Sequence, residues 1–555
     1  MGFLSSLWYA CLLGALLVGV AICYVLRVMF ILPLFDPMRK LPGPKSVGLF
    51  GNHMNLVMNA NITDKTCDKL VKTYGKTMRV DGFGSWDPRF YTLDHRALTY
   101  VLNNSNKYQK PWQSRRIIGG LIGYGMLATE GATHRVQKKV ITPAFSSANL
   151  RDFLPIFFSK AKELLSQWND SMEISTQDDK KVVSFETDVY HWMARAAFDM
   201  IGLAGFDYAF NAIQNEDNPV YIAYKRMFGM TLDQNRGFLH TILSVYCPWL
   251  YKIFPDEATK AVTASHEVIY AKCKELVETK REAVLKEMEY GNKDEPVKDL
   301  LSRLLKSNLE TSLPDNQRLP DSDLMDNINT MLFAGSDTTS LALAWTLHLL
   351  ALHPDIQNSL RADLVSLQHS VADPSDPVLF PALDELPQLD NIIRESLRLI
   401  PPVHSSLRVA MENDIIPTAE PIRMRDGTMN NSGVHIKKGT YVHIALEGMN
   451  MLRDVWGEDA PEFRPTRWNN LPEAVKQNPG IYGGMMTFSH GPRACIGVRF
   501  SVMIMKTFLY FLLTSYRFEP VMRITKENHV MVRPHPNGEW RKPSKLPLRI
   551  SRIES

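Results

Sequence analysis

FSHGPRACIG, residues 488–497, encloses one cysteine in a loop that also holds three glycine or proline residues. Gly491 and Pro492 favour a turn before Cys495, and Gly497 leaves room for a flat ligand or another backbone to approach. The apolar run CIGVRFSVMIMKTFLYFLL (495–513) predicts a buried helix that begins at the cysteine. Free N–H groups and the dipole at the start of a helix stabilise a thiolate, so the loop favours a reactive sulfur.

Arg493 lies two residues before the cysteine, where it can meet an acidic group on whatever the sulfur binds. An inert buried cysteine is the usual interpretation of a lone cysteine, but it does not explain these neighbours. A planar iron porphyrin with acidic propionates fits the cysteine, the arginine and the glycines. The other cysteines, at 11, 23, 67, 247 and 273, form no CxxC pair, so we expect neither a disulfide framework nor a zinc site.

Composition and periodicity indicate one large, mainly helical domain. The 555 residues are 45% hydrophobic with a net charge of +4 and no long basic run, so nucleic acid is not an expected partner. The mostly apolar stretch 322–354 predicts a long helix with Ser322 as its N-cap and Pro354 closing it. Strand-like segments lie at 77–83, 439–446 and 529–534. We therefore predict a mainly α fold with small β-sheets.

The N-terminus predicts one membrane-spanning helix. Residues 2–26 carry no charge, and at about 1.5 Å per residue they can span a hydrocarbon core of roughly 30 Å. Arg27, Arg39 and Lys40 follow this segment, which places the main body on the cytosolic side. The next residues, LPGPK (41–45), favour a stiff and extended exit from the membrane.

The pattern FxxGxRxCxG resembles the haem-binding loop of the cytochrome P-450 monooxygenases, and other motifs of that family follow in order over residues 41–555. The resemblance implies a cytochrome P-450 fold, with an anchor and linker at 1–40 and a haem domain at 41–555. It implies haem b (iron protoporphyrin IX) as the cofactor, with Cys495 as the axial thiolate ligand of the iron. It also implies that the other pattern positions surround the haem, namely Phe488, Gly491, Arg493 and Gly497.

Two further motifs of the family concern arginines. In ESLR, Glu395 and Arg398 share a helix face, and PEFRPTRW (461–468) is similar to the family's meander segment. The resemblance implies that Arg467 joins them in a buried structural triad, whereas a solvated ion pair is the ordinary interpretation of such a pair. The segment PPVHSSLR (401–408) resembles the turn that lines the pocket, so Arg408 is either a propionate partner or a surface arginine.

The chain departs from the family pattern in one helix. Where WxxxR often stands near the haem propionates, EGATHRVQKKVITPAF (130–145) has His134 and Lys138. Both side chains can donate to a carboxylate, but lysine lacks the bidentate fork of arginine. The alternative for both residues is a solvated helix face.

AGSDTT (334–339) lies within the predicted long helix. The small residues Ala334 and Gly335 would leave room above a flat cofactor, so we expect both to line it. Thr338 can donate a proton during oxygen cleavage and Asp337 can relay protons from outside, both in general-acid roles. The alternatives are a threonine bonded to its own backbone and an aspartate on a solvated face.

The leading hypothesis is a membrane-bound haem-thiolate monooxygenase that hydroxylates or epoxidises an apolar small molecule with O₂. The resemblance implies electrons from NADPH through NADPH–cytochrome P-450 reductase, with cytochrome b5 as a further candidate partner. The chain as a whole resembles fungal microsomal members of the family. This resemblance suggests secondary metabolism, a terpenoid-like substrate and a single pass through the endoplasmic reticulum membrane. Alternatives are xenobiotic, aromatic or fatty-acid substrates, a non-redox isomerase or dehydratase, and a haem carrier without catalysis. Fold does not specify the ligand.

Overall fold

A computed structural model describes residues 2–59, 61–174, 184–231, 243–290, 299–309, 318–371, 373, 377–528 and 531–553. It is mainly helical with small β-sheets, as the sequence predicts. The α-helices are α1 (Gly2–Leu26), α2 (Met54–Met58), α3 (Thr63–Tyr74), α4 (His95–Asn103), α5 (Trp112–Ile122), α6 (Gly131–Ile141), α7 (Ser147–Arg151), α8 (Leu154–Ile174), α9 (Val189–Phe206), α10 (Pro219–Thr231), α12 (Pro248–Ile253), α13 (Glu257–Tyr290), α14 (Leu300–Leu309), α15 (Asp321–Leu352), α16 (Pro354–Ser370), α17 (Phe380–Asp384), α18 (Pro387–Leu399), α19 (Leu446–Asn450), α20 (Arg453–Trp456) and α21 (Val498–Ser515).

Short strands and single helical turns complete the fold. The strands are β1 (Thr77–Asp81), β2 (Pro88–Thr92), β3 (Tyr108–Gln109), β4 (Ser184–Asp188), β5 (Ser406–Ala410), β6 (Asp414–Ile416), β7 (Ile422–Arg423), β8 (Met429–Asn430), β9 (Val434–Ile436), β10 (Tyr441–Ile444), β11 (Tyr516–Pro520), β12 (Ile524–Asn528), β13 (Val532–Pro536) and β14 (Pro547–Arg552). The short turns are the π-helix η1 (Arg27–Ile31) and the 3-10 helices η2 (Leu32–Phe35), η3 (Pro37–Lys40), η4 (Thr142–Phe145), η6 (Pro377–Leu379), η7 (Pro465–Asn469), η8 (Glu473–Gln477), η9 (Met486–Phe488) and η10 (Gly491–Arg493).

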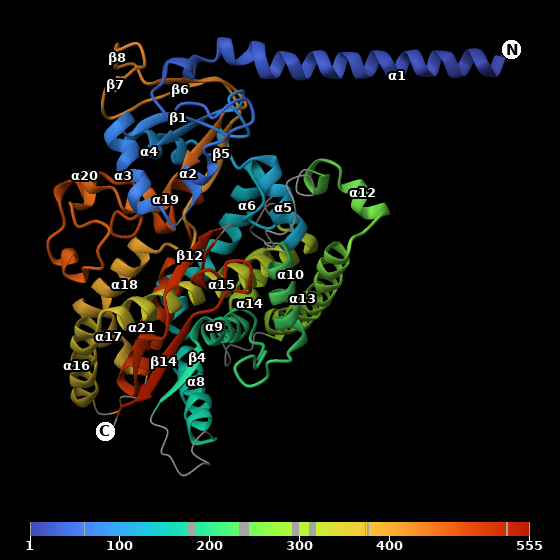
Figure 1. The fold of residues 1–555 in the computed structure, drawn as a ribbon. Coiled ribbons are helices and arrows are strands. Elements are labelled where there is room, and N and C mark those ends of the chain that lie inside the picture. Colours follow the sequence, from blue (N-terminus) through green and yellow to red (C-terminus); the bar gives the residue numbers. More distant parts are fainter. Residues whose placement is uncertain are drawn as a thin grey trace.

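Helix α15 crosses the middle of the molecule and packs along α9 and against α18 and α21 (Figure 1). Its residues 339–351 are all buried, which explains why this helix is apolar on every side in its second half. The helix begins at Asp321, with Pro320 at the N-cap, so the prediction that Ser322 caps it is wrong by two positions. Pro354 opens the next helix, α16, because proline is accepted in a first helical turn.

The largest sheet has five strands in the order β1-β2-β10-β5-β3 and lies at the end of the body near α1 (Figure 1). The predicted strands at 77–83 and 439–446 are β1 and β10 of this sheet. In it, β10 pairs parallel to β2 and antiparallel to β5, with Val442 opposite Arg408. Residues 532–534 of the third predicted strand belong to β13, while 529–530 lie outside the described residues.

Helix α1 extends away from the body as a single rod (Figure 1). Among the described residues, two helical stretches are long and apolar enough to cross a membrane. Val498–Ser515 is two-thirds buried inside the fold and is a core helix, whereas Leu12–Phe35 is not buried at all. The N-terminal stretch therefore fits a single membrane anchor, as the sequence predicts.

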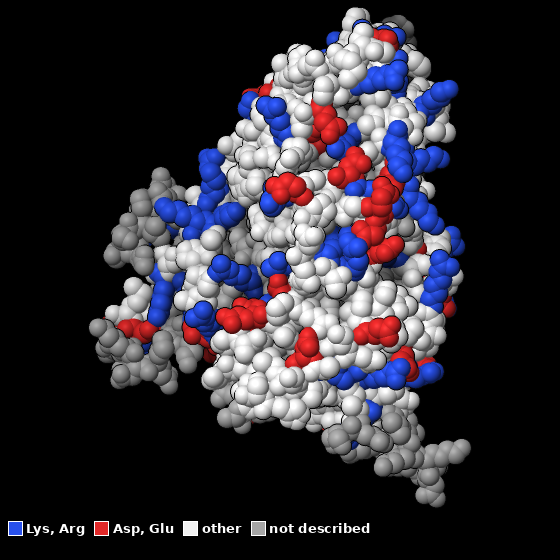
Figure 2. All heavy atoms as spheres, turned by 90° about the vertical axis from the view of Figure 1, so that its left-hand side faces the viewer, with Lys and Arg blue, Asp and Glu red and all other residues white. Residues whose placement is uncertain are grey.

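The face built around α16, α18 and α20 carries charges of both signs. Figure 2 shows Lys and Arg side chains there interspersed with Asp and Glu. Such a surface presents charges of both signs. A partner with acidic groups would therefore meet local groups of basic residues there instead of a uniformly positive face.

Candidate functional site

The Cys495 loop is held by backbone geometry that needs glycine. Gly491 has φ +69°, and a Cβ at this position would lie 2.8 Å from the carbonyl oxygen of Leu102 at the end of α4. The Cys495 N–H donates to the Phe488 carbonyl at 3.0 Å, which closes the loop. The ring of Phe488 packs edge-on against Tyr482 at 5.6 Å between centroids. A glycine at 491 is therefore required by both φ and contact with α4.

Helix α21 begins at Val498, so the prediction that it begins at Cys495 is wrong by three residues. Gly497 is the N-cap, and its N–H and Lys138 lower the pKa of the Cys495 thiol, although burial outweighs both and the net shift is upward. Cys495 is nevertheless an exposed residue. A Cβ added to Gly497 would meet only that sulfur, at 3.9 Å. The sulfur and the glycine thus leave an open approach for a flat ligand.

Arg493 turns from the cysteine loop toward the segment before α6. It forms an ion pair with Glu130, and its Nη2 donates to the Thr129 carbonyl at 2.7 Å. Its Nη1 donates to the Met126 carbonyl at 3.3 Å, whereas its Nε is buried without a hydrogen-bond partner. A buried guanidinium nitrogen without an acceptor is costly, so this atom indicates a missing acceptor.

Lys110 and Arg408 interact electrostatically with the same carboxylate, and His134 and Lys138 interact with Arg493 beside it. We call these four residues with Arg493 and Glu130 the Glu130 cluster. Burial and the charge of Arg493 lower the pKa of Lys110 to about 7 and that of His134 to about 3. Burial lowers the pKa of Arg408 to about 10 and also lowers that of Lys138. These pKa values fall first because the groups are buried and second because the neighbouring charge of Arg493 repels a further positive charge.

The Glu130 cluster fits a porphyrin that carries two carboxylates. Lys138 donates to the Pro492 carbonyl at 2.6 Å, and Arg408 donates to the Ser406 hydroxyl at 2.6 Å. Neither forms an ion pair with a carboxylate among the described residues. His134 is 6% exposed, so the alternative of a solvated helix face does not apply to it. Two propionates would neutralise the excess positive charge and would supply acceptors for the arginine nitrogens.

Lys110 and Glu130 were missed by sequence reasoning. Lys110 follows β3 and reaches the Leu127 carbonyl at 2.8 Å, while its backbone N–H donates to Glu130 Oε1 at 3.1 Å. These residues lie more than 350 positions from the cysteine in the sequence, and no motif connects them with it. Only chain folding brings them to the cysteine loop.

Glu395, Arg398 and Arg467 form a compact ion-paired group. Glu395 Oε1 accepts from Arg398 Nη2 and from Arg467 Nε, each at 2.8 Å, and all three side chains are at most 1% exposed. The carboxylate also accepts from the Trp468 indole at 3.0 Å. Arg467 has a second carboxylate in Asp459 at 3.0 Å, so the two arginines face two carboxylates. The solvated ion pair is thereby excluded.

Ala334 and Thr338 lie on one face of α15, one turn apart. Ala334 is exposed although the helix around it is largely buried, so it borders open space inside the fold. The Thr338 hydroxyl donates to the Ala334 carbonyl at 2.7 Å, which is the backbone-bonded alternative. Gly335 points elsewhere: a Cβ there would lie 3.0 Å from Ile201 of α9. Its small size serves the close packing of α15 on α9, and the expectation that Gly335 also lines the cofactor stays a prediction.

Asp337 is held by partners from two distant elements rather than exposed on a solvated face. Its carboxylate forms an ion pair with Arg533 of β13 and accepts a hydrogen bond from the Tyr190 hydroxyl of α9 at 3.1 Å. The Asp337 side chain is 16% exposed and that of Arg533 is 14% exposed. Sequence reasoning missed Tyr190 and Arg533, because nothing in their local sequence distinguishes them.

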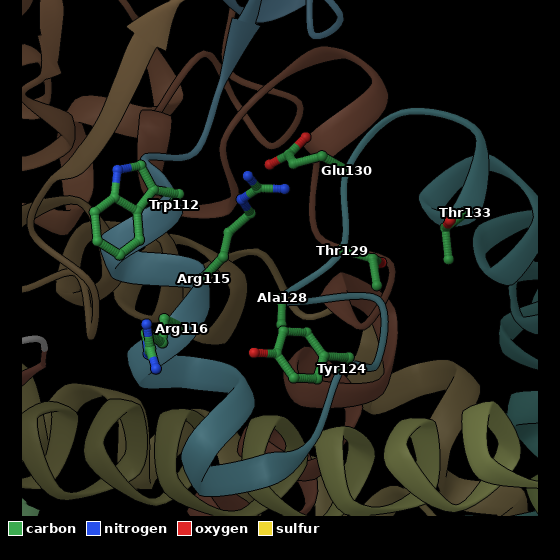
Figure 3. Close-up of a pocket in the computed structure, with 8 residues that line it drawn as sticks. All are labelled: Trp112, Arg115, Arg116, Tyr124, Ala128, Thr129, Glu130 and Thr133. Atoms are coloured by element: carbon green, nitrogen blue, oxygen red, sulfur yellow. The ribbon is translucent and has the colours of Figure 1, made fainter. Parts of the chain in front are cut away.

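A pocket of about 460 Å³ lies between α5 and the start of α6, next to the Glu130 cluster. Figure 3 shows Arg115 pointing toward Glu130, with Arg116 and Trp112 farther along the wall formed by α5 and Tyr124 on the floor. Sequence reasoning missed this pocket. Its lining residues are Trp112, Arg115, Arg116, Tyr124, Ala128, Thr129, Glu130 and Thr133.

Comparison with known proteins agrees with this geometry. A family model described as Cytochrome P450 matches residues 41–540. Cytochrome P450 monooxygenase 128 of Postia placenta is 35% identical, over 96% of each chain, and ganoderic acid synthetase of Ganoderma lucidum is 32% identical over 87% of this chain and 88% of its own. Cytochrome P450 monooxygenase claO of Ampulloclitocybe clavipes is 32% identical over 92% of this chain and 93% of its own. The chain therefore belongs to the cytochrome P450 family of haem-thiolate monooxygenases.

Proposed function

We propose that this monooxygenase binds haem b between α15 and the Cys495 loop, with Cys495 as the axial iron ligand. The observation that supports this most directly is the accessible cysteine beside a cluster whose cations exceed its carboxylates. A haem-thiolate centre, when bound, supplies the activation of O₂. Arg493, Arg408 and His134 would bind the propionates, and Lys138 would hold the loop through the Pro492 carbonyl.

The residues of α15 supply space and protons. Ala334 keeps the helix face open, and Thr338, one turn later, places a hydroxyl on the same face. Asp337 is its sequence neighbour, and we assign to it the relay of protons from outside, with Arg533 and Tyr190 orienting its carboxylate. Glu395, Arg398 and Arg467 are structural and hold the segment before the cysteine loop.

We further propose an anchor and linker at 1–40 and a haem domain at 41–555. The apolar stretch Leu12–Phe35 and the basic residues after it support a single pass through the endoplasmic reticulum membrane, with the haem domain in the cytosol. Electrons would come from NADPH through NADPH–cytochrome P-450 reductase, with cytochrome b5 as a further partner. Exposed Lys139 and Arg499, close in sequence to Lys138 and Cys495, offer local basic groups for such a partner.

The substrate that we propose is an apolar, terpenoid-like small molecule of fungal secondary metabolism, hydroxylated or epoxidised by one oxygen atom of O₂. One relative is named ganoderic acid synthetase, which supports this class.

The test is NADPH consumption by membranes that contain the full chain and a fungal reductase, measured with a library of terpenoids. We expect substrate-dependent consumption with one oxygen inserted per product. Cys495→Ser should lose this activity and also the red-shifted Soret band of the reduced carbon monoxide complex, because oxygen is a weaker donor than thiolate. A mutant that keeps the band would disprove the ligand assignment, and product formation without NADPH would indicate a non-redox reaction.

Thr338→Ala tests proton delivery from α15. A positioned general acid contributes about a hundredfold or more, so product per NADPH should fall sharply while hydrogen peroxide rises. Haem content and the carbon monoxide spectrum should stay as in the parent. Thr346→Ala is the control for helix stability, because it removes a buried hydroxyl two turns away that bonds both the Ala342 carbonyl and Ser396 of α18. Unchanged product per NADPH in Thr338→Ala would mean that another group donates the proton.

A further inference from the structure

We propose that the pocket between α5 and α6 binds an anionic group, a carboxylate, at one end of the substrate, through Arg116 and Arg115. This inference rests on the proposed function, because it names the class of apolar molecule that the haem site oxidises: an apolar skeleton with a carboxylate.

The first argument is that the part of the chain the structure describes supplies no counter-charge to the two arginines. The one acidic residue among the pocket-lining residues is Glu130, and its two oxygens are already engaged, Oε2 by Arg493 and Oε1 by the Lys110 backbone N–H at 3.1 Å. The described residues supply no ion pair for Arg115 or Arg116, and Arg115 Nε is buried without a hydrogen-bond partner. Guanidinium groups in such a pocket are suited to a planar, bidentate anion.

Two haem propionates do not consume all of this positive charge. They would be met by Arg493, Arg408 and His134, and the two arginines also lower the pKa of Lys110 beside Glu130. Arg115 lies between that cluster and the pocket, whereas Arg116 stands farther along α5 and away from Glu130 (Figure 3). Arg116 is exposed to the pocket, so an anion that enters the pocket can pair with it.

The remaining lining suits an apolar skeleton. Trp112 and Tyr124 are 43% and 53% exposed and offer aromatic surface, and the ring of Tyr124 lies so close to α5 that a Cβ on Gly119 would be 2.7 Å from it. Trp112 packs edge-on against Tyr246 at 5.2 Å between centroids, which places an aromatic pair at the rim. Apolar and aromatic walls with few placed charges are typical of small-molecule sites.

The pocket is also aligned with the proposed oxidation site. The turn that carries Tyr124 is bonded to α15, since the Tyr124 N–H donates to Asp326 Oδ2 at 2.7 Å. A Cβ on Gly125 would lie 2.3 Å from Thr330 Oγ1, so the pocket floor rests on α15 near Thr330. Ala334 and Thr338 follow on that helix, roughly 6 and 12 Å farther along its axis. A substrate with its carboxylate in the pocket would therefore place a carbon farther along its skeleton, roughly 12 Å away, near Thr338.

The experiment uses the full-length, haem-loaded protein in detergent. The probes are saturated fatty acids of eight to sixteen carbons and oleanolic acid, each paired with its methyl ester, and binding is followed by the haem spin-state change and by equilibrium dialysis. We expect the parent to prefer at least one acid over its ester. Arg116→Gln should weaken binding of that acid roughly 10-fold or more and leave the ester unchanged, because a charge-assisted bond is lost. Arg116→Lys should keep part of the preference.

Arg135→Gln is the matched control, since this arginine lies on α6 outside the pocket lining, with Nη1 3.4 Å from Asn106 Oδ1. It should bind acid and ester like the parent. Equal affinity for acids and esters in the parent, or an acid preference that survives Arg116→Gln, overturns the proposal. Loss of haem from Arg116→Gln and Arg116→Lys also overturns it, because the arginine then serves the cofactor. A parent without the carbon monoxide band would instead overturn the proposed function itself.

Discussion

Two buried ionic groups of this molecule differ in one respect. Around Glu395, two arginines face two carboxylates, and the Glu395 oxygens accept from Arg398, Arg467 and the Trp468 indole. In the Glu130 cluster, three cations or more share one carboxylate, pKa values are lowered, and Arg493 Nε has no partner. The charges of the first group are balanced within the protein, whereas those of the second are balanced only when anions bind.

The difference separates a structural role from a binding role without reference to motifs. Balanced and fully bonded charges stabilise a unique local structure, and they leave nothing for a ligand to satisfy. Unbalanced buried cations cost folding free energy, which a ligand with carboxylates recovers when it binds. The comparison predicts that mutations in the two groups will have different consequences.

The largest effect is expected for Glu395→Gln. Removing this charge leaves two buried guanidiniums facing each other, and breaking a buried pair costs about 3–5 kcal/mol. The free energy of unfolding in urea should fall by that amount, and little haem-loaded protein should accumulate. Glu473→Gln is the matched control, because Glu473 is 79% exposed and pairs with Lys476 on the surface, where such pairs are worth about 0–1 kcal/mol. Equal effects of the two substitutions would remove the distinction between the groups.

A smaller and different effect is expected for Arg493→Gln. The free energy of unfolding of the haem-free protein should change little, because the substitution also relieves repulsion among the cations. Haem affinity, measured by transfer to apomyoglobin, should fall about 10- to 100-fold, as for the loss of a charged hydrogen bond. Arg499→Gln, an exposed arginine on α21, should keep the parent affinity. If Arg493→Gln destabilises the haem-free fold as much as Glu395→Gln does, the Glu130 cluster is structural too.

The smallest effect is a pH dependence from Lys110. Its pKa of about 7 in the haem-free fold lies below the ordinary value of 10.5, so between these values the unfolded chain binds the extra proton. The Lys110 contribution to the free energy of unfolding therefore rises with pH from about 7 to about 10.5. Lys110→Met should reduce this slope in urea titrations of the haem-free protein. The contribution of His134 to the free energy of unfolding changes between its pKa of about 3 in the fold and the ordinary value of 6.5, which is below this window. Equal slopes in the parent and Lys110→Met would show that the lysine stays charged.

Local sequence determined the parts whose chemistry is contained in a short stretch. The cysteine loop, the pairing of Glu395 with Arg398, the apolar anchor and the mainly helical class could all be predicted, because spacing along a helix or a turn decides which side chains meet. Helix ends were less certain: α21 starts three residues after Cys495, since the loop geometry at Gly491 and Gly497 delays it. The packing of Gly335 against Ile201 was not predicted, because the sequence does not say which helix a small residue faces.

Tertiary structure alone decided which distant groups share a site. Lys110 and Glu130 meet Arg493 from more than 350 residues away, and Arg533 reaches Asp337 from 196 residues farther along the chain. No pattern in the sequence relates these residues, because their proximity depends on how β3, β13, α6 and α15 pack together. The sequence determined that Cys495 lies in a tight loop followed by a buried helix. The folded chain decided how many cations surround that loop, and hence that the site requires anions.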